Sequence, residues 1–143
     1  MFYDIIKFLH SYWAYITLFA LAAATFNALI KFFGNKEFAP IDFRLSLFAL
    51  IATHTQLLLG IIFFAVSGYF SENSMGEIMK TPALRRIVIE HPFGMVLAIA
   101  ALTIGYSKHK KKLTSKPKFK ILAISYTIAL AIVLKMVPWA TWF

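Results

Sequence analysis

The sequence predicts an all-α, polytopic membrane protein that folds as a single four-transmembrane-helix bundle over residues 1–143. Three observations predict this class. The chain is 60% hydrophobic with a mean hydropathy of +0.73, whereas soluble domains are roughly 45–50% apolar. It contains four long apolar stretches, and basic residues gather around two of the three connections between them. Little of the chain remains outside these stretches, so no separate soluble domain is expected.

The four predicted helices cover about 5–33, 45–69, 87–106 and 119–137. Each is long enough to cross a hydrocarbon core of about 30 Å, which takes about 20 helical residues. The first is too long for a cleaved signal peptide and lacks its basic amino-terminal region. Pro40 and Pro117 mark the ends of the first and third connections. In the longest connection, at about 70–86, one short amphipathic turn is expected around Met75 to Met79.

The net charge of +9 indicates membrane topology rather than nucleic-acid binding. Ten of the fifteen Lys and Arg residues flank the first and third connections: Lys31, Lys36, Arg44, Lys108, Lys110, Lys111, Lys112, Lys116, Lys118 and Lys120. By the positive-inside rule these connections are cytoplasmic, which places both termini and the connection at 70–86 outside. The run YSKHKKKLTSKPKFK has no aromatic interleaving, so contact with anionic membrane lipid is expected and nucleic-acid binding is not. His109 lies in this run and is expected to be solvated.

The chain has no cysteine. Disulfides, thiolate metal sites, iron–sulfur clusters and covalent haem attachment through a Cys-x-x-Cys-His motif are therefore excluded. Any metal or cofactor has to be held by other side chains, and histidines are the first candidates.

Three histidines, His10, His54 and His91, fall inside three different predicted helices. Ionisable residues within a membrane are costly and rare, so they are functional candidates by default. His10 and His91 lie about five and four residues into their helices from the outer side, at equal depth within a few ångströms. A bis-histidine haem requires two imidazoles at one depth on facing helices, and this pair meets that condition. Interfacial polar residues and a non-haem metal site are the alternatives for the pair.

The residues around this pair are suited to a haem. Two propionates need cations at the membrane edge, and four basic residues are expected there: Lys7, Arg85, Arg86 and Lys135. Glu90, beside His91, is expected to orient His10 or to pair with Arg86, because adjacent helical residues point about 100° apart. A metal-ligating histidine normally donates its second N–H to a carboxylate or a carbonyl group.

His54 lies deeper, about fifteen residues or roughly 20 Å inward from Tyr69. With Thr53, Thr55 and Gln56 it favours a buried, hydrogen-bonded polar cluster. A second haem, a quinone or proton-relay site, and direct ligation of the first haem remain open for it.

Four segments carry a resemblance: LHSYWAY, FRLSLFALIATHTQLLLG, EHPFGM and IGYSKHKKKLTSK. Together they resemble the small four-helix proteins of the bacterial inner membrane that are grouped as cytochrome b. The resemblance covers nearly the whole chain and implies haem b with His10, His54 and His91 as candidate ligands. A weaker likeness, limited to HTQLLLG and the four-helix pattern, is to one half of haem A synthase. The acidic motif of that enzyme has no counterpart here, so haem modification is not implied.

The leading functional hypothesis is a membrane electron carrier that holds haem b and passes electrons between a quinol and other membrane subunits. No nucleophile and base pair is visible, so the chain is not expected to be an enzyme alone. The alternative is a cofactor-free accessory subunit of a larger inner-membrane assembly. A transporter is disfavoured because the chain has neither an inverted repeat nor a broken midspan helix.

Overall fold

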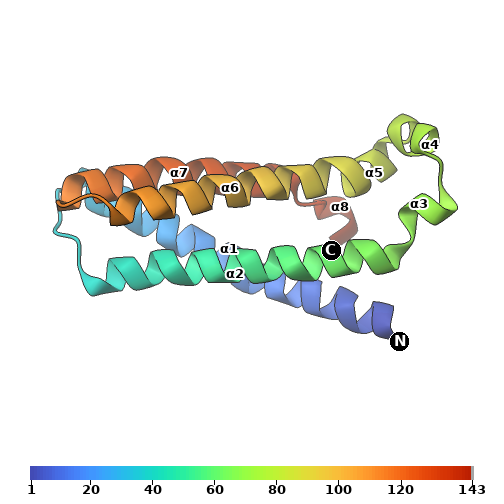
Figure 1. Cartoon of the computed structure of the whole chain (residues 1–143), viewed down its shortest axis with the longest axis horizontal. Helices are drawn as coiled ribbons and strands as arrows, with labels where there is room; N and C mark the ends of the chain where they lie inside the picture. Colours follow the sequence, from blue (N-terminus) through green and yellow to red (C-terminus); the bar gives the residue numbers. More distant parts are fainter. Residues whose placement is uncertain (143) are drawn as a thin grey trace.

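The protein is a bundle of four long helices, seen in a computed structural model that describes residues 1–142 (Figure 1). The long helices are α1 (Phe2–Phe33), α2 (Pro40–Ser67), α6 (His91–Lys110) and α7 (Ser115–Met136). The short ones are α3 (Tyr69–Glu72), α4 (Met75–Lys80), α5 (Pro82–Arg85), the π-helical turn η1 (Arg86–Glu90) and α8 (Trp139–Trp142). The described residues contain no β-strand, which confirms the all-α prediction.

Four helical segments are long and apolar enough to span a membrane: Phe2–Phe33, Pro40–Glu72, Pro82–Lys110 and Ser115–Met136. The four predicted stretches correspond to these segments, one to one. The third differs most, since it begins at Pro82 and ends at Lys110 rather than at about 87 and 106. Hydropathy marks only the lipid-embedded part of a helix, whereas lysine and arginine continue a helix readily. The amphipathic turn expected around 75–79 is α4.

The contacts between the long helices place α1 diagonally opposite α6. α1 packs against α2 and α7, and α6 packs against α7 and α2. α1 and α6 therefore face each other across the bundle. Both termini and α3 to α5 lie at one end, which we name the terminal end (Figure 1). The opposite end carries the connections 34–39 and 111–114, and we name it the lysine-rich end.

Small residues let the helices approach closely. Ala20, Ala24 and Ala28 form a buried stripe along α1, and Ala98 of α6 is fully buried. Tyr126 of α7 is also fully buried, and its hydroxyl donates to the backbone carbonyl of Ser46 at 2.8 Å. In lipid, close packing and interhelical hydrogen bonds take the place of the hydrophobic effect between helices. This packing is what fixes the relative positions of the side chains described below.

Gly105 of α6 marks the tightest contact with α7. A methyl group added at Gly105 would overlap the Ser125 side chain. We expect Gly105→Ala to lower stability by about 1–3 kcal/mol, because a packed interface must shift to admit the methyl group. The thermal midpoint of unfolding in detergent measures this. Gly76→Ala is the matched control, since a methyl group added there would lie 3.9 Å from its nearest neighbour, the Ser74 hydroxyl. Equal losses of stability in the two variants would contradict a tight contact between Gly105 and α7.

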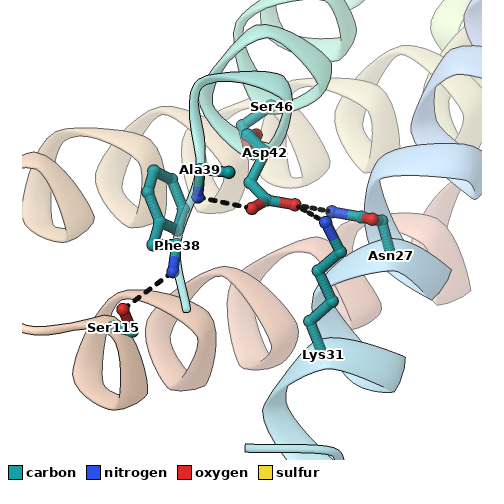
Figure 2. A network of polar contacts seen from close by, with 7 residues as sticks. All are labelled: Asn27, Lys31, Phe38, Ala39, Asp42, Ser46 and Ser115. Carbon is teal, nitrogen blue, oxygen red and sulfur yellow. Dashed lines mark hydrogen bonds and ion pairs between the residues drawn. The ribbon is translucent and has the colours of Figure 1, made fainter. Parts of the chain in front are cut away.

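A polar cluster ties α1 to the start of α2 at the lysine-rich end (Figure 2). Asp42 is fully buried, and its Oδ1 accepts hydrogen bonds from Asn27 Nδ2 at 2.8 Å and Lys31 Nζ at 2.6 Å. Its Oδ2 accepts from the backbone N–H of Ala39 at 2.8 Å, which satisfies a free donor of the first turn of α2. The Phe38 N–H donates to Ser115 Oγ at 2.7 Å and so joins the same turn to α7. We name Asn27, Lys31, Ala39 and Asp42 the Asp42 cluster.

Candidate functional site

The backbone before His91 departs from α-helical geometry. Pro92 has no N–H, and its ring conflicts with the carbonyl group four residues earlier, at Val88. The chain adopts the π-helical turn η1 here, and the His91 N–H bonds to the Arg86 carbonyl, five residues back. Such single π turns insert a residue into a helix and recur at functional sites. The turn changes the direction in which His91 points relative to the residues before it.

One ring nitrogen of His91 is fixed by the end of α7. Pro138 disfavours helical geometry at the residue before it, and Val137 is extended, with φ −63° and ψ 129°. Helix α7 therefore ends at Met136, whose carbonyl lies 2.9 Å from His91 Nδ1. A carbonyl oxygen only accepts, so Nδ1 carries the proton of this hydrogen bond, and in a neutral ring Nε2 has the free lone pair.

Gly94, one turn beyond His91, makes this approach possible. A side chain at this position would overlap Met136. The absence of a Cβ lets the end of α7 lie directly against α6, within reach of the imidazole.

His10 faces His91 from the diagonal helix α1. The two ring centroids are 6.4 Å apart and the ring planes are perpendicular. His10 Nδ1 is buried and has no hydrogen-bond partner. Gly60 of α2 leaves room for the ring, because a Cβ there would lie 3.2 Å from His10 Cε1. The structure thus brings together the two histidines that the depth argument paired.

A third residue, Gln56 of α2, holds the same part of α1. Its Nε2 donates to the backbone carbonyl of His10 at 2.7 Å. Its Oε1, like His10 Nδ1, is buried without a hydrogen-bond partner. Buried polar atoms are paired in most proteins, so these two atoms, on contacting residues of α1 and α2, are open to a further polar partner.

The two imidazoles lie close enough to belong to one site. No group of three or more His, Asp or Glu residues that could hold a metal occurs among residues 1–142. Two histidines suffice only when the remaining ligands come from the cofactor, as they do in a haem.

The charged residues of the terminal end fall into two sets. Arg85 Nε pairs with Glu90 Oε2 at 3.1 Å. The expectation that Glu90 orients His10 or pairs with Arg86 is therefore wrong, because the π turn brings Arg85 beside it instead. Arg86 Nη2 donates to the Lys135 carbonyl at 3.0 Å, next to the carbonyl that His91 contacts. The side chains of Lys7, Arg86 and Lys135 are exposed and form no ion pair within the described part of the chain.

His54 lies apart from the pair. It is exposed, so the expectation of a buried cluster is wrong. Its Nδ1 is 2.8 Å from the Leu50 carbonyl, and its Nε2 is 3.3 Å from Thr103 Oγ1 on α6. It is about six residues, or roughly 9 Å of helical rise, from Gly60, which adjoins His10. His54 therefore links α2 to α6 on the outside of the bundle.

His109 is fully buried rather than solvated, so that prediction is wrong. Helix α6 continues to Lys110, and the rings of Phe38, Phe43 and Tyr106 lie 5.7, 6.1 and 5.0 Å from the imidazole. The lysines beside His109 in the sequence led to the prediction of a solvated side chain. Phe38 and Phe43, beside the first connection, could have indicated an aromatic cluster.

Asp42 is the ionisable residue that the sequence analysis missed. Asp42 could have been found from its position three residues after Ala39, because a carboxylate at that position caps the first turn of a helix. Both carboxylate oxygens of Asp42 accept hydrogen bonds within the Asp42 cluster. We therefore assign Asp42 a role in stabilising the fold rather than in a cofactor site.

The fold and the paired histidines define a class, that of multi-pass helical membrane proteins with two imidazoles facing each other inside the bundle. Comparison with known proteins yields no match to any family model, curated protein or solved structure. The functional argument therefore rests on the geometry of His10 and His91.

Proposed function

We propose that this protein binds one haem b between His10 and His91 and acts as an electron-transfer component of a bacterial inner-membrane complex. The single observation that carries the proposal is the 6.4 Å separation of two perpendicular imidazoles on diagonal helices. A membrane quinone and further membrane-protein subunits are the proposed redox partners. Both termini would lie on the periplasmic side, as the lysine distribution predicts.

The residues present fit the group. The hydrogen bond from His91 Nδ1 to the Met136 carbonyl leaves Nε2 as the ligand nitrogen and is the kind of outer contact that orients metal-bound histidines. His10 supplies a second imidazole with an unpaired buried nitrogen. A haem bound there would supply one-electron transfer, with a potential set by its axial ligands and its burial.

Cations at the same end fit the propionates. Arg86, Lys7 and Lys135 are exposed at the terminal end, and Arg86 is held beside the His91 contact by the Lys135 carbonyl. Arg85 is less available, because Glu90 already neutralises it. We therefore assign the propionate contacts to Arg86, Lys7 and Lys135 before Arg85, with Glu90 as the residue that positions Arg85.

One observation favours a second candidate, a cofactor-free accessory subunit. His91 and Arg86 both satisfy free carbonyl groups at the end of α7, and such capping stabilises a bundle whether or not a cofactor is bound. The orphaned nitrogen of His10 favours the haem site over this candidate, because capping gives that nitrogen no role.

The test is the dithionite-reduced minus oxidised absorption spectrum of the detergent-purified protein, with haem quantified as the pyridine haemochrome. We expect a sharp α band of the six-coordinate b type at one haem per chain. Protein that stays free of haem after expression with haem supplied would reject the proposal and leave the accessory subunit.

A further inference from the structure

Two apolar grooves flank the exposed edge of α7 near the lysine-rich end. One lies between α6 and α7, beside Gly105 and Ser125. The other lies between α1 and α7, beside Phe32. Ile124 and Ile128 line both grooves and form a ridge between them. Each groove is almost wholly apolar, so it suits a hydrocarbon chain rather than a polar ligand.

Each groove also has one lysine in its lining. Lys108 lines the groove between α6 and α7, and Lys120 lines the groove between α1 and α7. The two helices run antiparallel and meet at Gly105 and Ser125, about three and five residues from these lysines. The lysines therefore lie within roughly 3 Å of the same depth, one at the head of each groove.

These two lysines differ from the other lysines of α6 and α7 at this end. Lys110 lies over the Tyr106 ring, Lys116 donates to Asn35 Oδ1, and Lys118 donates to the His109 carbonyl. Lys108 and Lys120 are exposed and have no polar or aromatic partner within the described chain. Among the lysines of α6 and α7 at this end, the unpaired ones are thus the two that adjoin the grooves.

We infer that the grooves bind one anionic glycerophospholipid, with an acyl chain on each side of the Ile124 and Ile128 ridge and its phosphate between Lys108 and Lys120. Two apolar grooves match two acyl chains, and two unpaired cations match one anionic headgroup. Basic residues beside membrane helices attract anionic lipid with about 1 kcal/mol each. This site lies at the opposite end of the bundle from His10 and His91 and does not depend on haem.

The test is native mass spectrometry of the delipidated full-length protein with added phosphatidylglycerol or phosphatidylcholine of identical acyl chains. We expect one phosphatidylglycerol per chain and at least tenfold weaker binding of phosphatidylcholine. Replacing both Lys108 and Lys120 with glutamine should weaken phosphatidylglycerol binding about 30-fold, which corresponds to about 1 kcal/mol for each lysine. Equal binding of the two lipids by the unaltered protein would overturn the inference.

Two further variants separate this site from general attraction to a basic loop. Changing Lys111 and Lys112 to glutamine removes the same charge outside the grooves and should leave phosphatidylglycerol binding unchanged. Thr127→Trp fills the groove between α1 and α7 with both lysines intact and should lower it at least fivefold. A loss with the Lys111 and Lys112 variant equal to that of the groove lysines, no effect of Thr127→Trp, or a lysine-independent dimer seated on the grooves would each contradict the site.

Discussion

Replacing His91 with alanine is expected to abolish haem binding. The substitution removes one of the two facing imidazoles, and it also leaves the Met136 carbonyl at the end of α7 without its donor. His10→Ala should have the same result, because a bundle with one remaining histidine holds haem at most weakly and in five-coordinate form. Haem per chain and the reduced α band of each purified variant measure the effect, and we expect less than a tenth of the unaltered value.

His54→Ala is the matched control. His54 is exposed and bonds to Leu50 and Thr103, away from the pair, so its removal should leave most of the haem in place. Full haem content in either the His10 or the His91 variant would reject the pairing. Loss of haem only in the His54 variant would instead identify His54, on the outer surface of α2, as the ligand.

A misfolded variant would also lose haem, so a rescue separates ligation from folding. His10→Gly leaves a space beside Gly60 that free imidazole can enter. If His10 is a ligand, added imidazole should restore the six-coordinate spectrum in the His10→Gly variant, whereas the spectrum of the His54→Gly variant should not respond. Restoration of the band requires a folded bundle, so a positive result excludes collapse as the cause of the loss.

The fold could be predicted from the sequence because lipid imposes a strong constraint. A membrane core leaves the helix as the simple solution for each apolar stretch, and about 20 residues set its length. The limits of α6 could not be predicted, because the lysines beyond Tyr106 continue the helix without adding hydropathy. The short helices at the terminal end follow from local turn chemistry, and among them only α4 was expected from the sequence, as an amphipathic turn.

The site could be predicted in part. Residue counts from the helix ends place His10 and His91 at one depth, and the structure puts their rings 6.4 Å apart. The direction of the neighbouring side chains could not be read in the same way, because the π turn before His91 shifts the register of Arg85, Arg86 and Glu90. The carbonyl that fixes His91 also escaped notice, since a backbone acceptor has no signature in the side-chain sequence.

Asp42→Ala should produce the largest loss of stability among the substitutions that leave the histidines intact. The carboxylate is fully buried and accepts three hydrogen bonds, from Asn27, Lys31 and the Ala39 N–H. Removing one partner of a buried ion pair costs about 3–5 kcal/mol. We expect about 3 kcal/mol, because Lys31 is 27% exposed and regains some solvation. The thermal midpoint in detergent and the extent of unfolding in a denaturing detergent titration measure this loss.

Asp4→Ala is the control for the loss of an aspartate as such. Asp4 is 81% exposed at the other end of α1 and pairs with the amino terminus at 3.7 Å, so its removal should change stability by less than about 0.5 kcal/mol. Equal effects of the two substitutions would show that the Asp42 cluster contributes nothing specific.

A second substitution at Lys31 tests the physical cause. If the cost of Asp42→Ala arises from an ammonium group left without its acceptor, then Lys31→Met in the same chain should recover part of it, because no unpaired charge remains. If the cost arises mainly from the lost cap of α2, the double variant should be as unstable as Asp42→Ala alone. In both cases haem per folded chain should stay constant, since the cluster and the two facing histidines lie at opposite ends of the bundle, and a parallel loss of haem would contradict the separation of architecture from site.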